Sequence, residues 1–236
     1  MSTFFLSDLH LDPSRPEITA LALAFLRGPA LQADAIYLLG DVFEAWIGDD
    51  AIQPPADALA QALKALNDAG VAVYFIHGNR DFLLGADYAE RAGMRLLPDP
   101  AVIDLYGTAT IIQHGDLVCT DDTAYLAFRA QARDPAFIAG FLAQSPAQRL
   151  AFAQKARQAS AASQAAMKDS NQSAFETITD ATPEAIADTF ARFGCQRMIH
   201  GHTNRPAIHQ HLFNGRLCTR VVLGDWHQHG SVLAVD

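Results

Sequence analysis

The chain has 236 residues, half of them hydrophobic and 18% charged, so it is long and apolar enough to bury one large core. This composition excludes a disordered acidic chain. Its 26 acidic and 17 basic residues leave a formal net charge of -9, which argues against a broad basic surface for nucleic acid, and we expect no nucleic-acid partner.

The first part of the chain predicts neither a signal peptide nor a membrane span. The apolar run Phe4–Leu6 is interrupted at once by Asp8 and His10. A second run, Ala20–Leu26, ends at Arg27, well short of the ~20 residues that a spanning helix needs. The three cysteines are far apart and form no CxxC pair, which favours a reducing compartment. We therefore expect the chain to reside in the cytoplasm.

Short apolar runs alternate with helical patterns along most of the chain, which predicts an α/β fold. Helices are expected at Glu17–Arg27 and Ala56–Ala69. A third helix is expected to start at Thr182 and Pro183 and to end at Gly194. The predicted strands, in chain order, are Thr3–Leu6, Ala35–Leu39, Val71–Ile76, Thr108–Gln113, Met198–His200, Val221–Leu223 and Val232–Val235.

The segment from about residue 122 to 168 interrupts this alternation, because it lacks a strand pattern and has a helical composition almost throughout. Ser145 followed by Pro146 predicts the start of a long helix. The segment is either an ordinary helical hairpin packed on the core or a helical cap over a site on the main domain. We favour the cap, since long excursions between core elements are usually functional. Residues 1–236 would then be a single domain with a helical cap insertion.

Polar clusters follow five of the predicted strands. They are Ser7–His10, Gly40–Asp41, His77–Asp81, His114–Asp116 and His200–Asn204. Because the carboxyl ends of the strands in an α/β sheet form one rim, we expect these clusters to meet. Each cluster alone has an ordinary explanation, such as a turn, a cap or a buried structural histidine. Together they supply oxygen donors and imidazoles that suit Mn²⁺, Fe²⁺ or Zn²⁺, and a bridging carboxylate would complete a binuclear metal centre.

In this order the clusters resemble the motifs of the calcineurin-like metallophosphoesterase superfamily: Asp-x-His, Gly-Asp, Gly-Asn-Arg-Asp, His-Gly-Asp and Gly-His-Thr. The longer strings GDVFEAWIGDD at 40–50 and GNRDFLLG at 78–85 resemble, within that superfamily, the UDP-2,3-diacylglucosamine diphosphatase family of lipid A biosynthesis. The resemblance covers essentially the whole chain and is weakest between Ala130 and Pro183.

The resemblance implies a β-sandwich flanked by helices, with a helical insertion that covers acyl chains. It implies a hydrolase that cuts the pyrophosphate of UDP-2,3-diacylglucosamine into UMP and 2,3-diacylglucosamine 1-phosphate, known as lipid X. It further implies two Mn²⁺ ions per chain and a peripheral location at the cytoplasmic face of the inner membrane.

The resemblance also implies roles for individual residues. The metal ligands would be Asp8, His10, Asp41, Asn79, His114 and His202, with Asp41 bridging. The catalytic residues would be Asp41, Asn79, Arg80 and His114. The substrate would contact Asn79, Arg80, Asp122, Tyr125, Ser160, Gln164, Met167 and His202.

Three positions depart from the family pattern. Asn204 stands where a second histidine would complete the first metal's shell, and we hypothesise that its amide oxygen or a water fills that place. Gln164 and Met167 stand where the family tends to have Asn and Lys. Gln164 is an amide exchange, whereas Met167 cannot supply a cation.

Two other functions stay open. The same metal core could act on a soluble nucleotide or phosphoester. A catalytically weakened protein, suggested by Asn204, would bind lipid or nucleotide without turnover.

Three acidic residues near the second cluster, Glu44, Asp49 and Asp50, either line the site or belong to a solvated turn.

Overall fold

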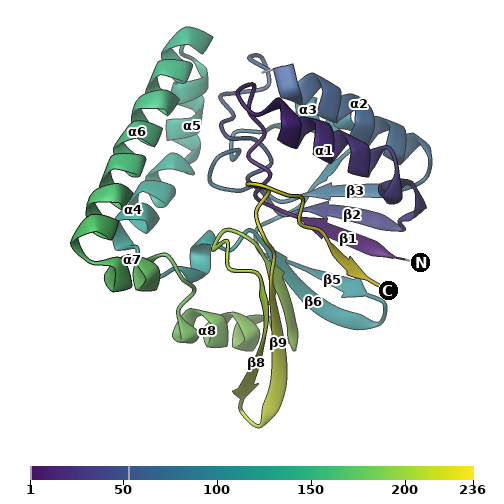
Figure 1. Cartoon of the computed structure of the whole chain (residues 1–236), viewed down its shortest axis with the longest axis vertical. Coiled ribbons are helices and arrows are strands. Elements are labelled where there is room, and N and C mark those ends of the chain that lie inside the picture. The colour runs from purple at the N-terminus through teal and green to yellow at the C-terminus, as the bar shows by residue number, and fades with distance from the viewer. Residues whose placement is uncertain (1, 53) are drawn as a thin grey trace.

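Two five-stranded sheets stack on each other at the centre of the computed structural model, which describes residues 2–52 and 54–236 (Figure 1). The strands are β1 (Thr3–Leu6), β2 (Ala35–Leu38), β3 (Ala72–Phe75), β4 (Arg95–Leu96), β5 (Ala101–Leu105), β6 (Thr108–Gln113), β7 (Arg197–His200), β8 (Ala207–Phe213), β9 (Arg216–Val222) and β10 (Leu233–Val235). The first sheet has the order β10–β1–β2–β3–β4, and the second has the order β5–β6–β7–β9–β8.

Most strands that precede a polar cluster run parallel to one another. In the first sheet β1, β2, β3 and β4 are parallel, and β10 is antiparallel to β1. In the second sheet β6, β7 and β9 are parallel, and the two outer strands are antiparallel to their neighbours. The loops after β1, β2 and β3 therefore leave the same edge of one sheet, and those after β6 and β7 leave the same edge of the other.

The alternation of side chains along the strands divides the core into layers. In β1, Phe5 points between the two sheets, whereas Leu6 faces the helices. The buried side chains between the sheets are Phe5, Leu39, Ile76, Ala101, Leu105, Ile112, Ile199 and Leu223. The inner strands thus bury side chains on both faces of each sheet, which accounts for much of the apolar content of the chain.

Helices cover the outer faces of the two sheets (Figure 1). The helices are α1 (Pro16–Leu26), α2 (Pro54–Asp68), α3 (Ala86–Ala92), α4 (Thr123–Ala132), α5 (Pro135–Leu142), α6 (Pro146–Ser170), α7 (Gln172–Ile178) and α8 (Pro183–Phe193), with short 3-10 turns η1 (Pro29–Gln32) and η2 (Asp116–Val118). In α2, Leu59, Leu63 and Leu66 are buried against the first sheet, as their spacing predicts. In α8, Ile186 and Phe190 pack on the second sheet.

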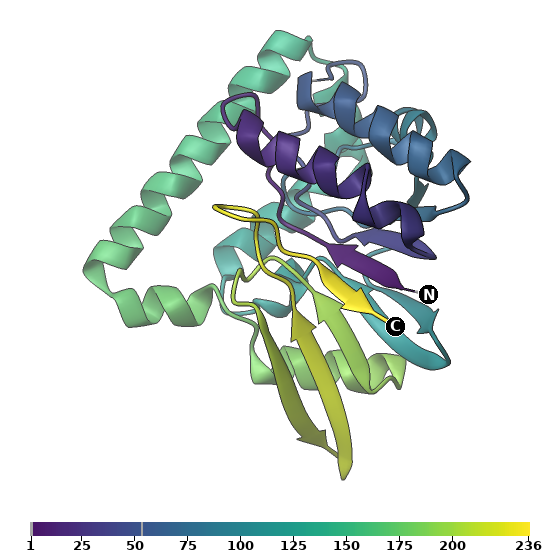
Figure 2. The same cartoon turned by 45° about the vertical axis from the view of Figure 1, so that its right-hand side comes forward.

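Helices α4–α7 lie beside the sandwich, and α6 runs along its side from the region of α1–α3 toward α8 (Figure 2). The predicted start of α6 is confirmed, because Ser145 and Gln148 form a capping box. The first turns of α6 are fixed by Arg149, whose side chain is only 1% exposed. Its guanidinium donates to the Ile47 carbonyl over 2.7 Å and to Asp50 over 2.8 Å. Asp50 therefore binds this helix.

The predicted fold class is confirmed: two sheets packed as a sandwich, flanked by helices. The helical segment after residue 122 continues through α7, beyond the limit expected near residue 168. Elements α3, β4, β5 and β8 were not predicted, nor was β9 before Val221. Among the residues that the structure describes, no helix is both long and apolar enough to traverse a bilayer.

Candidate active site

Asp41 lies at the centre of the site, directly after β2, and only 2% of it is exposed. Its Oδ2 is 3.8 Å from Nε2 of His10, and its Oδ1 is 3.7 Å from Nε2 of His114. Two groups of side chains that could hold a metal ion share this carboxylate, namely Asp8–His10–Asp41 and Asp41–His114–His202. The two oxygens of Asp41 thus face different groups, so this one carboxylate could bridge two ions.

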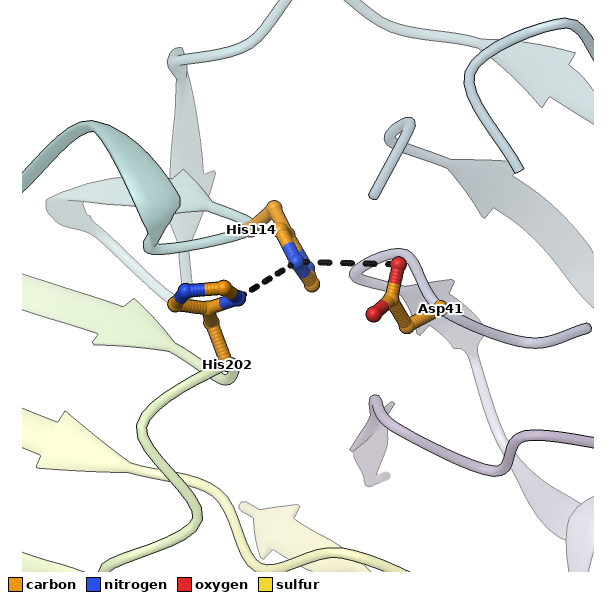
Figure 3. Close-up of side chains that lie close together, drawn as sticks. All are labelled: Asp41, His114 and His202. Atoms are coloured by element: carbon orange, nitrogen blue, oxygen red, sulfur yellow. Dashed lines mark hydrogen bonds and ion pairs between the residues drawn. The ribbon is translucent and has the colours of Figure 1, made fainter. Parts of the chain in front are cut away.

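The second group gathers loops from both sheets, and its three side chains point toward one another (Figure 3). His114 is fully buried after β6, with Nδ1 2.9 Å from the Leu39 carbonyl. Its Nε2 lies 3.0 Å from Oδ1 of Asn79 and 3.1 Å from Nδ1 of His202. A carbonyl partner on Nδ1 fixes the ring and leaves Nε2 available for a metal.

Asp8 joins the first group to the loop of the second. One carboxylate oxygen accepts a hydrogen bond of 2.9 Å from the backbone N–H of His202, and the other lies 3.8 Å from Nε2 of His10. The six expected metal ligands from Asp8 to His202 therefore converge, although they come from five separate loops.

Strained backbone marks the same loops. Asp8, His10, Asp41, His202 and Asn204 all have positive φ, between 48° and 68°. Non-glycine residues rarely adopt this left-handed region, and such residues cluster at functional sites. Asn204 is exposed, whereas the other four are buried or half-buried.

Two glycines allow the loops after β2 and β3 to touch. A Cβ at Gly78 would overlap the carboxylate and the backbone nitrogen of Asp41. A Cβ at Gly40, where φ is +85°, would overlap the backbone of Gly78 and lie 2.8 Å from Nδ1 of His114. The Gly-Asp and Gly-Asn motifs therefore reflect a close backbone approach that only glycine permits.

Asp81 is fully buried and holds the loop that carries Asp41. It accepts hydrogen bonds from the backbone N–H groups of Val42 and Gly78 over 2.8 Å, and of Asp41 and Phe43 over 3.2 and 3.4 Å. Asp81 belongs to the Gly-Asn-Arg-Asp motif, but the sequence alone indicates no role for it. Its role is to position the backbone, since it connects the loops after β2 and β3.

The side chains of the site perturb one another's protonation. Burial raises the pKa of Asp41 to about 6, against the opposing charges of His114 and His10. Burial alone would lower the pKa of His114, but the carboxylates of Asp41, Asp8 and Asp116 raise it to about 9. Burial, with the neighbouring His114, lowers the pKa of His202 to about 4.

This donor set fits a divalent cation. Carboxylates, imidazoles and one amide oxygen are gathered in a buried space, and such a mixture suits borderline metals such as Mn²⁺, Fe²⁺ and Zn²⁺. Without a metal, the carboxylates around His114 favour its protonated, positively charged form. A bound cation would supply that positive charge, and His114 would then bind it as a neutral imidazole.

The loops that carry the candidate metal ligands, which follow β1, β2, β3, β6 and β7, are called the metal loops here. A pocket of about 350 Å³ lies between these loops and α6. Its lining residues are Glu44, Arg80, Gln154, Arg157, Gln158, Ser160, Ala161 and Gln164. Three expected substrate contacts, Arg80, Ser160 and Gln164, therefore share one cavity. Met167 lies near the end of α6, where its carbonyl accepts from Asn171, and is not part of this lining as the structure describes it.

Asp122 and Tyr125 lie on the other side of the site, at the start of α4. Asp122 caps the helix by accepting from the backbone N–H of Tyr125 over 2.9 Å. The ring of Tyr125 is 6.1 Å from that of His202, and its hydroxyl donates to Asp116. Arg129, one helical turn later, donates to Asp116 over 2.7 Å. These contacts anchor α4 beside the metal loops.

Glu44 belongs to the site, whereas Asp49 belongs to the scaffold. Glu44 has Oε2 2.9 Å from Nδ1 of His10. Asp49 accepts from Trp46 Nε1 over 2.9 Å and from the first turn of α3 at Gly85 and Tyr88. The sequence left the roles of Glu44 and Asp49 open. Arg129 belongs to a string that resembles the family, Tyr125 with Phe128 and Arg129, but the sequence indicated no role for it.

A β-sandwich that gathers two candidate metal-binding groups around one shared aspartate has the arrangement of a two-metal site, which phosphatases, nucleases and aminopeptidases use. Residues 1–206 match the family model of calcineurin-like phosphoesterases. All 236 residues align with the UDP-2,3-diacylglucosamine hydrolase of Stenotrophomonas maltophilia strain K279a, at 65% identity and over 95% of that protein. They also align with the UDP-2,3-diacylglucosamine hydrolase of Xanthomonas campestris pv. campestris strain ATCC 33913, at 62% identity and over 96% of it.

The chain belongs to the calcineurin-like phosphoesterases and, within them, to the family of UDP-2,3-diacylglucosamine hydrolases. The family expected from the motifs is thereby confirmed, and with it a hydrolase that uses divalent metal.

Proposed function

We propose that this chain hydrolyses the pyrophosphate of UDP-2,3-diacylglucosamine to UMP and lipid X in lipid A biosynthesis. The observation that carries the proposal is the buried Asp41 carboxylate, shared by two metal-binding groups beside a pocket lined by Arg80 and α6. The names of relatives that are 61% to 65% identical over the whole chain support the substrate.

Two Mn²⁺ ions per chain are the proposed cofactors. Asp8, His10 and Asp41 would hold the first, and Asp41, Asn79, His114 and His202 the second. When bound, such cations would supply positive charge for the phosphoryl oxygens and lower the pKa of a water nucleophile. Carboxylate, amide and imidazole donors together support manganese over a purely oxygen-bound magnesium.

Arg80 is proposed to hold the phosphoryl oxygens of the substrate. Its backbone N–H donates to Oδ1 of Asp41 over 2.8 Å, so its side chain starts beside the bridging ligand. Among the residues that the structure describes, none accepts a hydrogen bond from its buried Nε, although Arg80 lines the pocket. A phosphate oxygen would accept a hydrogen bond from this Nε, and the planar guanidinium group can donate to two phosphate oxygens at once.

The reaction needs no covalent intermediate. Cys119, the thiol nearest to the site in sequence, is buried, and burial raises its pKa to about 12. A thiol with so high a pKa is a poor nucleophile near neutral pH. Attack by water on one phosphorus of the pyrophosphate therefore accounts for the products directly.

Helices α4–α7 are proposed to form the cap, inserted into a single domain that spans residues 1–236. The apolar side chains of the cap divide into two sets. Phe141 packs in the core beneath the cap and is not free to bind acyl chains. Leu142, Leu150 and Phe152 are exposed and are proposed to contact acyl chains or the cytoplasmic face of the inner membrane.

The acyl chains distinguish the proposed substrate from a soluble one. We expect the chain to release UMP from UDP-2,3-diacylglucosamine at least about a hundredfold faster than from UDP-N-acetylglucosamine, because each buried methylene contributes about 0.8 kcal/mol. The rates of UMP release at equal, subsaturating substrate concentrations measure this difference. Equal rates would favour the alternative, a phosphoesterase for soluble nucleotides.

Asn204→His is expected to strengthen the first metal site, since an imidazole binds divalent transition metals more tightly than an amide oxygen. The Mn²⁺ concentration that gives half-maximal UMP release should fall by roughly tenfold, or about 1.4 kcal/mol. Asn214→His is the matched control, because Asn214 has a similar φ of 50° but lies outside the metal-binding groups, in the turn between β8 and β9. An unchanged metal requirement in Asn204→His would remove position 204 from the site.

A further inference from the structure

The two ring nitrogens of His10 face different partners. Nε2 points into the first metal-binding group, at 3.8 Å from both Asp8 and Asp41. Nδ1 is buried and lies 2.9 Å from Oε2 of Glu44, but the N–H direction is not aligned for a hydrogen bond of good geometry. Glu44 is thus the carboxylate nearest to the nitrogen that faces away from the group.

The carboxylate of Glu44 is also held from its other side. Oε1 lies 2.5 Å from Nη2 of Arg157, which projects from α6. The backbone N–H of Glu44 donates to the Leu11 carbonyl over 3.1 Å, which ties the loop after β2 to the loop that carries His10. The side chain of Glu44 is 18% exposed and that of Arg157 is 40% exposed, so water screens the arginine more than the carboxylate.

An imidazole binds a metal through one nitrogen only when the other carries the proton, and the partner of that second nitrogen decides which is which. The negative charge of a carboxylate 2.9 Å from Nδ1 favours the proton on that nitrogen, which leaves the lone pair of Nε2 for the metal. His10 is the only imidazole in its group among the residues that the structure describes. The orientation of this one ring therefore has a large influence on the group's affinity.

We propose that Glu44 is a positioning residue for His10, and that Arg157 holds Glu44 in place, so that helix α6 supports the first metal-binding group. The inference rests on the proposed function, because it takes Asp8, His10 and Asp41 as metal ligands. Helix α6 would then both line the pocket and, through Arg157, hold Glu44 against His10.

Titration of the metal-stripped chain with Mn²⁺, without substrate, tests the positioning role through binding alone. Glu44→Ala should weaken one of two binding steps by about 10- to 100-fold and leave the other unchanged. Glu44→Gln keeps an oxygen that accepts from Nδ1–H, so it should restore part of the affinity and carries the test if the alanine variant does not fold. Glu90→Gln, which removes an exposed carboxylate from α3, is the control for charge.

The same titration tests the link through Arg157. Arg157→Gln should weaken the step that Glu44→Ala weakens, by a few-fold, and should have no further effect in the Glu44→Ala background. Lys155→Gln removes an exposed positive charge two residues earlier on α6 and should leave both steps unchanged. An effect of Arg157→Gln that persists without Glu44 would contradict the link.

The outcomes separate this inference from the proposed function. Two Mn²⁺ steps in the unmodified chain, with one lost in Asp8→Ala, establish the first group as a metal site. Equal Mn²⁺ affinities of the unmodified chain and Glu44→Ala would then overturn the positioning role alone. Failure of the unmodified chain to bind Mn²⁺, or an intact titration in Asp8→Ala, would overturn the proposed metal centre itself.

Discussion

Replacement of Asp41 by alanine should lower UMP release from UDP-2,3-diacylglucosamine by roughly a thousandfold or more, about 4 kcal/mol of transition-state stabilisation. The expected loss is large because each oxygen of this carboxylate faces a different metal-binding group, at 3.7 and 3.8 Å from the nearest imidazole nitrogens. One substitution therefore removes a donor from both groups. The rate of UMP release at saturating Mn²⁺ measures the effect.

The fold should survive this change. Burial raises the pKa of Asp41 to about 6, which means that its buried charge costs the folded chain free energy, and alanine removes this cost. Asp57→Asn is the control, since Asp57 lies on the exposed side of α2, where it forms an ion pair with Arg91. Circular dichroism should show the same spectrum for both variants. UMP release that persists in Asp41→Ala would contradict the bridging role.

Replacement of Asp81 by alanine should destabilise the chain by about 3–5 kcal/mol and also weaken metal binding. The carboxylate accepts from four backbone N–H groups in a fully buried space, and alanine would leave these donors without an acceptor. Because three of the donors belong to the loop of Asp41, the bridging carboxylate would lose its position. Urea unfolding and Mn²⁺ titration measure the two effects.

Asp49→Ala is the matched control for Asp81. Asp49 also binds two backbone N–H groups and one indole N–H, but it serves α3 rather than the metal loops. The Asp49→Ala substitution should therefore lower the free energy of unfolding, while the chains that remain folded still bind Mn²⁺ with unchanged affinity. If Asp81→Ala also bound Mn²⁺ normally, the connection between this carboxylate and the metal loops would be wrong.

The sequence predicted the inner strands well because they are buried on both faces. β1 and β6 have the predicted bounds, and β2, β3 and β7 differ by one or two residues. β8 was missed because it contains two histidines and a glutamine and has no fully buried position. β4 has only two residues, both exposed, and forms by pairing with β3. Such pairing is tertiary and leaves no local pattern.

The convergence of the candidate metal ligands could be predicted because each follows a strand whose end is fixed by the fold. The residues that support them could not, since their contacts connect distant parts of the chain. Asp81 binds backbone that is some 40 positions earlier, and Arg149 binds Ile47 across 102 positions. Glu44 lies next to recognisable ligands, but only the structure shows which ring nitrogen it faces.

The most direct test of the whole account is incubation of the purified chain with UDP-2,3-diacylglucosamine and Mn²⁺, followed by measurement of UMP and lipid X. We expect equal molar amounts of the two products, no release after removal of metal by a chelator, and recovery when Mn²⁺ is restored. Tight binding of the substrate without release of UMP would contradict the proposed hydrolysis and would identify the chain as a lipid- or nucleotide-binding protein.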